Sequence, residues 1–242
     1  MKKISSILLA VLSLSMIFFT SSCNDSDNDT LYSSFITISK NFPPDNYAIF
    51  TDDSTRLYTT GEQSAYIENL QITREEQRAF IYFTLEDSQE PSNSSNTKTF
   101  INIKQISSIL TKDIIKTEEI DTLGSDPINI NNTWFSNGGD NLSTYINIEF
   151  SFPTSGISNT QHIIYLGDDL AADAINDELP IDNEGYYNLT FAHNAMEDTQ
   201  NYTSYNGIVS FPIPSDMLNT KGLKITVNTT DGIETYTYDF EQ

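Results

Sequence analysis

The stretch GLKITVNTTDGIETYTYDF, residues 222–240, has the alternation and the turn residues of a β-hairpin. Asp231-Gly232 favours a two-residue turn, because glycine accepts the positive φ that such turns require. With this turn, facing residues have numbers that sum to 463, and one face pairs Leu223 with Phe240, Ile225 with Tyr238 and Val227 with Tyr236. The other face pairs Thr226 with Thr237, Asn228 with Thr235 and Lys224 with Asp239. One apolar and one polar face predict a half-buried sheet.

The same period of two recurs elsewhere in the chain. The clearest run is Ile146, Ile148, Phe150 and Phe152, and shorter runs are Ile81, Phe83 and Leu85, then Ile101 and Ile103. Alternation of this kind is typical of strands with one buried face, whereas helices repeat about every 3.6 residues. The sequence therefore predicts an all-β chain.

The N-terminus has the features of an export signal. Lys2 and Lys3 precede an apolar run from Ile4 to Phe19, and Thr20-Ser21-Ser22 supplies small residues before Cys23. The run is shorter than the roughly 20 apolar residues that span a bilayer, so we expect a signal peptide over residues 1–22 rather than a retained membrane anchor. Cys23 is the single cysteine of the chain, and its position resembles the lipid-accepting cysteine of bacterial lipoproteins.

The segment after Cys23 is acidic and polar. Residues 24–29 read NDSDND, which offers nothing to bury, and we expect a lipidated, flexible tether over residues 23–40. The stretch resembles the signal that sends some bacterial lipoproteins to the outer face of the outer membrane. The first expected partner is therefore the membrane, through the lipid anchor at the cell surface, with the periplasmic face as the alternative.

Composition limits the classes of partner. The chain has 242 residues, 12 Lys+Arg and 34 Asp+Glu, and a net charge of -22. Binding to a phosphate backbone needs clustered basic residues, so we expect no nucleic-acid partner. Residues 117–125 are polar and end in Gly124-Ser125 before Asp126-Pro127, which predicts a domain boundary near Asp121.

Several segments carry a family resemblance. Ile109–Ile115, Gly124–Ile128 and Trp134 resemble the domain junction of the NigD-like lipoproteins, and Leu189–Ala195 and Tyr205–Phe211 resemble later segments of that family. The resemblance implies an N-terminal OB-like barrel over residues 41–121, followed by a C-terminal immunoglobulin-like β-sandwich over residues 122–242. It implies no established activity, and the association of the family's name with a bacteriocin operon suggests an immunity-like role against a secreted toxin.

Sequence motifs of common enzymes are not found. The chain has no Gly-x-Ser-x-Gly, no phosphate-binding loop and no His-Glu-x-x-His. His193 is in phase with Tyr187, Leu189 and Phe191, so the favoured interpretation is a structural, partly buried histidine. A zinc site built from His162, His193 and a carboxylate is the alternative. A pair of carboxylates that hydrolyses glycans also stays open, because sequence does not show spacing in space.

Two surface features are candidates for binding. Asp169, Asp173 and Asp177 are spaced four apart in a segment that we expect to be a short helix, where they would hold at most a weak calcium ion. Tyr186, Tyr187, Tyr202 and Tyr205 flank or lie in a polar loop and form a candidate ligand site for a glycan or a protein partner. We expect a lipid-anchored, non-catalytic binding or accessory protein without a cofactor. The alternatives are a glycan-acting hydrolase and an immunity-like protein.

Overall fold

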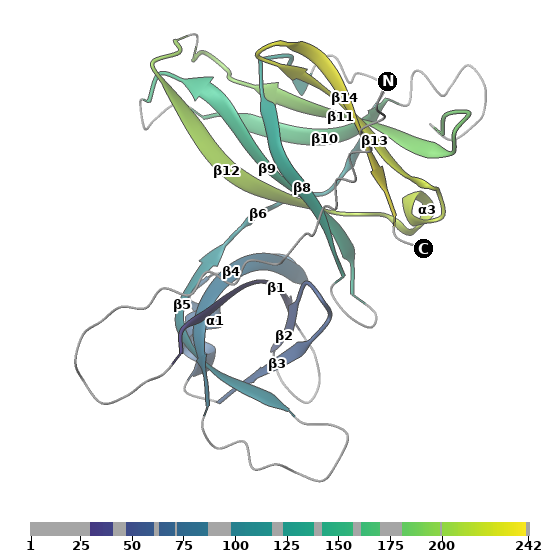
Figure 1. Ribbon diagram of the computed structural model, residues 1–242. Coiled ribbons are helices and arrows are strands. Elements are labelled where there is room, and N and C mark those ends of the chain that lie inside the picture. Colours follow the sequence, from purple (N-terminus) through teal and green to yellow (C-terminus); the bar gives the residue numbers. More distant parts are fainter. Residues whose placement is uncertain are drawn as a thin grey trace, which may run out of the picture.

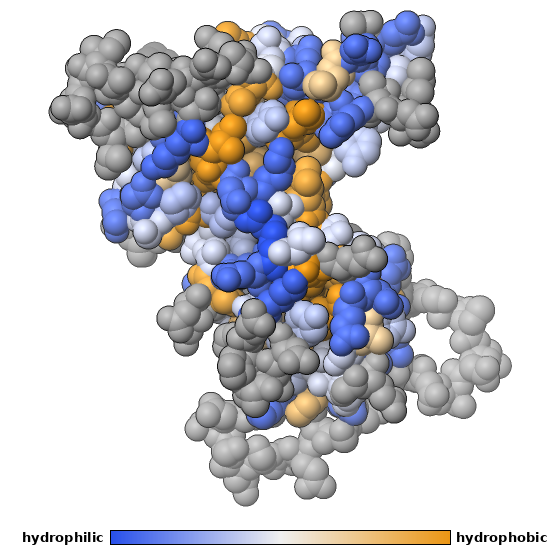
Figure 2. Space-filling model, turned by 180° about the vertical axis from the view of Figure 1, so that it is seen from behind, coloured by the Kyte–Doolittle hydropathy of each residue, from blue (hydrophilic) through white to orange (hydrophobic). Residues whose placement is uncertain are grey.

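The computed structural model describes residues 30–40, 47–60, 63–70, 72–86, 98–117, 123–137, 142–156, 161–169, 181–198 and 200–240. They form two lobes, a closed barrel and a β-sandwich, joined at a narrower waist (Figures 1 and 2). The prediction of an all-β chain with a barrel followed by a sandwich is confirmed. The expected signal peptide, residues 1–22, and Cys23 lie outside the described residues. Within the described ranges, no helix has the length and apolar character needed to cross a bilayer.

The barrel has five strands in the closed order β1-β2-β3-β5-β4. They are β1 (Tyr32–Lys40), β2 (Tyr47–Thr51), β3 (Arg56–Thr59), β4 (Glu76–Leu85) and β5 (Thr99–Ser108), with helix α1 (Ser64–Glu68) between β3 and β4. Alternate positions of the strands point inward and fill the barrel with aliphatic side chains, including Ile36, Ile38, Ile81, Ile101 and Ile103. This is the core that the period of two in β4 and β5 predicts.

The predicted extent of the tether is wrong at its C-terminal end. Residues 32–40 form β1, which pairs with both β2 and β4 and contributes Ile36 and Ile38 to the barrel core. Residues 36–39 are buried on both faces of the strand, with Ile36 and Ile38 toward the barrel core and Thr37 and Ser39 on the opposite face. Burial of the two isoleucines makes this segment part of the fold, although the residues before it are polar. The barrel therefore begins near Tyr32 rather than at residue 41.

The sandwich consists of two packed sheets. One has the order β14-β13-β11-β10-β7 and the other β6-β12-β9-β8. The strands are β6 (Leu110–Thr111), β7 (Ile115–Thr117), β8 (Asn129–Asn137), β9 (Thr144–Thr154), β10 (Ile163–Asp169), β11 (Tyr186–Asn194), β12 (Thr203–Pro212), β13 (Gly222–Thr229) and β14 (Gly232–Asp239), with helix α3 (Ser215–Leu218) before β13. Three pairs are parallel, β6 with β12, β7 with β10 and β11 with β13. The inner faces bury one apolar core that includes Ile148, Phe191 and Phe211.

The predicted domain boundary near Asp121 lies too far along the chain. β6 and β7 precede that residue, yet they pair with β12 and β10 of the sandwich. The sandwich therefore begins at about Leu110, directly after β5 ends at Ser108. Gly124 has a φ of 113° and lies so close to Asn194 that a Cβ would stand 2.6 Å from the Asn194 Cβ. Gly124 therefore lies within the sandwich, against the end of β11, rather than between two domains.

The C-terminal hairpin is present with a register two residues from the predicted one. Leu223 faces Tyr238, Ile225 faces Tyr236 and Thr226 faces Thr235, so the facing numbers sum to 461. The turn residues are Thr230 and Asp231, and Gly232 follows them with a φ of 125°. A slip of two residues preserves the faces, because side chains alternate with a period of two. Leu223, Ile225 and Val227 accordingly lie in the core, as predicted, with Tyr236 and Tyr238 packed against it.

A buried arginine joins the two lobes. Arg78 of β4 is fully buried on the outer side of the barrel, where its guanidinium pairs with Asp52 Oδ1 at 2.6 Å and donates to Thr37 Oγ1 at 3.0 Å. Its Nε donates to Asn147 Oδ1 of the sandwich at 3.3 Å, and Trp134 Nε1 donates back to Asp52 Oδ2 at 3.0 Å. Burial raises the pKa of Asp52, and the Arg78 charge opposes that rise. The ion pair and these hydrogen bonds compensate charges that are taken out of water where the lobes meet.

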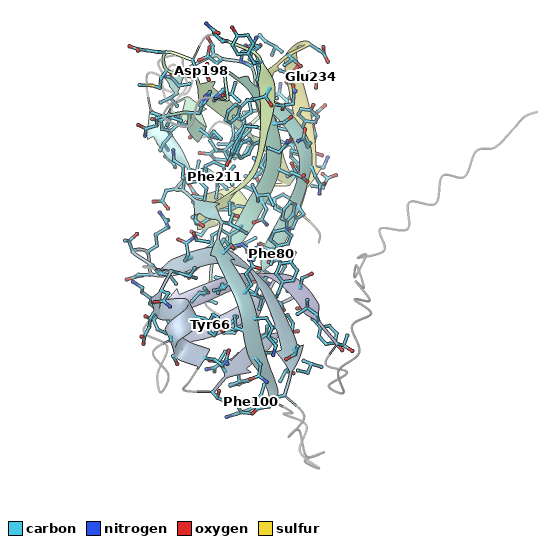
Figure 3. The ribbon with its side chains drawn as sticks, turned by 90° about the vertical axis from the view of Figure 1, so that its left-hand side faces the viewer. Tyr66, Phe80, Phe100, Asp198, Phe211 and Glu234 are labelled. Atoms are coloured by element: carbon cyan, nitrogen blue, oxygen red, sulfur yellow. The ribbon has the colours of Figure 1, made fainter. Side chains whose placement is uncertain are left out.

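Aromatic rings cover the same junction. Phe35 lies 4.9 Å from Phe80 in an edge-on arrangement and 5.0 Å from Trp134 of the sandwich, between ring centroids. Figure 3 shows Phe80 at the level where the barrel meets the sandwich. The Arg78 side chain is fully buried at this junction, while the Asp52 side chain keeps 25% of its surface exposed. The low dielectric around the guanidinium strengthens its attraction to Asp52.

Candidate functional site

The structure separates the four tyrosines that the sequence grouped. Tyr186 and Tyr187 are both buried on β11 and point to opposite sheet faces. The Tyr187 hydroxyl donates to the buried Asp168 at 2.7 Å, and the Tyr186 hydroxyl donates to Asp239 at 2.6 Å beneath Lys221. These two rings are structural. Only Tyr202 and Tyr205 present their rings to solvent, with 78% and 53% of their surface exposed.

Tyr202 and Tyr205 are exposed where β12 pairs with the end of β9, at one end of the sandwich. Asp198 anchors the turn that carries Met196, which is 55% exposed, to Thr154 at the same end of β9, and we call Tyr202, Tyr205 and Met196 the tyrosine surface. The Tyr205 ring stacks on Phe152 of β9 at 5.1 Å, and the Tyr202 backbone N–H donates to the Thr154 carbonyl at 3.0 Å. Strand β9 therefore holds the Tyr205 ring and the Tyr202 backbone in place.

A chain of polar contacts lies directly beneath the tyrosine surface. His162 Nδ1 is 3.0 Å from His193 Nε2, and His162 Nε2 is 3.2 Å from Asp198 Oδ2. The other end is closed by His193 Nδ1, 3.1 Å from the Pro127 carbonyl oxygen. Phe152 stacks on both imidazoles, with centroid distances of 4.5 Å to His162 and 4.4 Å to His193. The histidines, Asp198 and Phe152 form one packed unit that supports Tyr205.

The proton positions follow from the partners. The Pro127 carbonyl accepts only, so His193 Nδ1 carries a proton and donates to it, which leaves His193 Nε2 to accept from His162 Nδ1. The remaining nitrogen, His162 Nε2, faces the Asp198 carboxylate.

The pKa values of His193 and Asp198 are both lowered in the folded protein. Burial lowers the pKa of His193, and the charge of His162 adds to that effect. The backbone N–H of Ser155, 2.9 Å away, and the Thr154 hydroxyl hold the pKa of Asp198 well below its usual range. The folded state therefore favours a neutral His193 and an ionised Asp198, with His162 between them.

Thr154, His162 and Asp198 are residue types found in catalytic triads, but their hydrogen bonds differ from those of a triad. The Thr154 hydroxyl donates to Asp198 at 2.8 Å, whereas its contact with His162 Nε2 is 3.5 Å. In a triad the histidine accepts the hydroxyl proton, so Thr154 is not activated as a nucleophile here.

The zinc alternative brings together the expected residues, but the two imidazoles bond to each other. No group of three metal-binding side chains that could hold an ion occurs in the described part of the chain.

Acid is expected to destabilise this end of the sandwich through His193. Because its pKa is lowered in the folded state, the neutral form contributes stability above the unfolded value of about 6.5, and this contribution is lost as the pH falls below it. His193→Gln removes that titration. Urea unfolding of both proteins at pH 7.5, 6.5 and 5.5 should show a steeper loss for the wild type. Parallel losses would mean that His193 is not held neutral.

The predicted calcium site is only partly within the described residues. Asp169 ends strand β10 rather than lying in a helix, which is a correction to the prediction for that residue. Asp173 and Asp177 lie outside the described residues. The calcium site stays a prediction for these two residues.

A cleft of about 600 Å³ lies where the two lobes meet, and it contains the carboxylates Glu76 and Asp113. Glu76 Oε2 accepts from the Ser143 N–H at 3.0 Å and from the Tyr145 hydroxyl at 2.8 Å. Asp113 is paired with Arg74. Both carboxylates therefore have structural partners, unlike the acid and base of a glycan hydrolase, which must face the substrate.

The sequence did not single out Asp198 or Met196. Asp198 lies five residues after His193, in a turn that follows β11, and this spacing was the only available signal. The phase of His193 with Phe191 correctly predicted that its ring points inward, where it is 1% exposed. The approach of His162 comes from pairing between strands, which sequence does not show.

Comparisons with known proteins agree with this architecture. A family model described as the NigD-like C-terminal beta sandwich domain matches residues 111–240. No curated protein matches the sequence. A structure from Parabacteroides distasonis, described with the words "TOXIN related protein", is 28% identical with a TM-score of 0.62, over 87% of this chain and 93% of that one.

Two more distant structures share the fold. A protein of unknown function from Bacteroides vulgatus is 20% identical with a TM-score of 0.61, over 88% of this chain and 92% of that one. A NigD-like immunity protein from Bacteroides caccae is 17% identical with a TM-score of 0.52, over 90% of this chain and all of that one. The matched sandwich domain covers more than half of the sequence, from β6 to the residue after β14. The chain therefore belongs to the NigD-like family.

Proposed function

We propose that this protein is a lipid-anchored, non-catalytic binding protein whose partner is a secreted, toxin-like protein, in the manner of an immunity protein. The names of two similar structures, a toxin-related protein and an immunity protein, support the choice of partner. They favour the immunity-like alternative over a general accessory role. The glycan-hydrolase alternative has less support, because Glu76 and Asp113 in the cleft have structural partners.

The observation that carries the proposal is the tyrosine surface. Tyrosine offers a large apolar ring and a hydroxyl at a low cost in conformational entropy, which is why tyrosines dominate many protein interfaces. Tyr205 is held by Phe152, and Phe152 in turn by the two histidines. A surface ordered before binding loses little entropy when a partner docks.

The test begins with capture of secreted proteins by the mature chain on intact cells. The captured protein is purified and titrated by calorimetry against the wild type and Tyr202→Ser/Tyr205→Ser. Truncating two central aromatics should weaken binding by about 30-fold or more. Tyr66→Ser is the matched control, because Tyr66 is a tyrosine that is 40% exposed on helix α1 of the barrel. Equal affinity of the double variant and the wild type would refute the proposed surface.

The anchor is a separate part of the proposal. Cys23 is the single cysteine and follows the expected signal peptide, so the mature chain should begin at Cys23 with lipid attached. Intact mass of the native protein measures this directly, and Cys23→Ala should release the protein from membranes. A mature chain that begins elsewhere, or an unmodified Cys23, would remove the anchor from the account.

A further inference from the structure

Strand β14, Gly232–Asp239, is the outermost strand of the five-stranded sheet. Its inner side pairs with β13 over eight consecutive residue pairs, from Gly222 with Asp239 to Thr229 with Gly232. No strand of the described chain pairs with its outer side. A whole strand edge is therefore open in the described structure.

The register identifies the backbone groups that point outward. Thr229 and Gly232 flank the two-residue turn, and such a pair exchanges hydrogen bonds across the hairpin. Groups alternate along an antiparallel strand, so Glu234 and Tyr236 also bond to β13, whereas Ile233, Thr235 and Thr237 direct their N–H and C=O groups away from it. These outward groups, with those of Asp239, have the spacing that an added strand requires.

Proteins usually protect such an edge with lysine, proline, a bulge or a short strand. β14 contains neither lysine nor proline, and its pairing with β13 has no bulge. Ile233 is 78% exposed beside the open edge, and Thr235 and Thr237 are exposed as well. The charged residues of the strand are Glu234 and Asp239, both acidic.

The charge along β14 indicates which kind of segment can bind at its outer edge. The charged residues of β14 are Glu234 and Asp239, in a chain with a net charge of -22. Lys224 of β13 faces Thr237, but its ammonium group is paired with Asp182 and Glu184. We propose that the outer edge of β14 is a docking site for an extended, basic segment of another protein, which adds to the sheet as a further strand. Addition of a strand gives main-chain hydrogen bonds, and complementary charge gives specificity.

A second copy of this chain fits the edge poorly. Pairing two β14 strands would place the acidic residues of both copies side by side, and like charges facing each other across strands are destabilising. The site also differs from the tyrosine surface. Figure 3 shows Glu234 of β14 and Asp198, which lies beneath that surface, on opposite sides of the sandwich. The inference therefore does not depend on the proposed function.

The experiment uses the mature chain labelled for NMR and two ten-residue peptides, one alternating threonine with lysine and the other threonine with glutamate. The lysine peptide should slow hydrogen exchange at the outward amides of Ile233, Thr235 and Thr237, and the glutamate peptide should not. Thr235→Pro removes one outward N–H without removing a backbone hydrogen bond to β13, and should weaken binding of the lysine peptide about tenfold. It loses the side-chain contact with Thr226 of β13, a loss that Thr235→Ala shares. Thr235→Ala keeps that N–H and should bind like the wild type.

Thr237→Pro provides a second variant with the same expected loss, should Thr235→Pro fail to fold. Shifts spread over the whole acidic surface, equal binding of both peptides, or equal affinity of the proline and alanine variants would overturn the proposal. Dimers in sedimentation that are broken by Thr235→Pro would also overturn it, because the edge would then be occupied by a second copy.

Discussion

Replacing Arg78 with alanine is expected to lower the free energy of unfolding by about 3–5 kcal/mol, the usual cost of removing one partner of a buried ion pair. The variant leaves the Asp52 carboxylate in the buried junction without its cation and removes the donor to Asn147 of the sandwich. Because Arg78 lowers the pKa of Asp52, its loss should raise that pKa further. Urea unfolding followed by tryptophan fluorescence measures the effect, since Trp134 also binds Asp52.

Arg74→Ala is the matched control. Arg74 comes from the same part of the barrel and pairs with Asp113, but both side chains are partly exposed to solvent. An ion pair of this kind is worth about 0–1 kcal/mol, so the control should unfold nearly like the wild type. Similar losses for both arginines would show that Arg78 is not the residue that holds the lobes together.

Phe191→Ala is expected to cost about 3–5 kcal/mol, because it removes a buried aromatic ring and leaves a cavity. The ring is 1% exposed and packs edge-on against Phe211, with centroids 6.4 Å apart. Thr190→Ala, on the opposite face of β11, should cost little. Denaturant midpoints of the two variants measure the difference, and equal losses would mean that the buried face of β11 is assigned wrongly.

The hairpin shows what sequence can and cannot fix in a sheet. Alternation placed Leu223, Ile225 and Val227 on the core face correctly, because burial depends only on whether a position is odd or even. The register depends on the position of the turn. The Asp231-Gly232 signal placed the turn one residue too late in the chain, which shifts the pairing of the two strands by two residues. Both registers put the same residues in the core, so the hydrophobic pattern does not distinguish them.

The domain junction was beyond sequence reasoning for a different reason. Arg78 alternates with Ala79 and points outward from the barrel, a position that in an isolated barrel would face water. It is buried only because the sandwich packs against it, bringing Asn147 and Trp134 to Asp52 and Arg78. Contacts between distant segments decide its burial, and no local pattern encodes them.

The sequence predicts the exposed tyrosines of the candidate site but not the side chains that support them. Adjacent residues on a strand point to opposite faces, so the period of two already separates Tyr186 from Tyr187. Tyr202 and Tyr205 stay exposed at the end of the sandwich, where the sequence placed a polar loop. The support beneath Tyr205, from Phe152 to His162 and His193, comes from three different strands or strand ends and appears only in the folded chain.

The most direct test of the central claim is protection of sensitive cells. Cells are exposed to the purified protein that the mature chain captures, with and without the lipid-anchored chain on their surface. Our account predicts that the wild type and Tyr66→Ser restore growth, whereas Tyr202→Ser/Tyr205→Ser does not, although all three reach the membrane in equal amounts. Equal protection by the double variant, or no protection by the wild type, would contradict it.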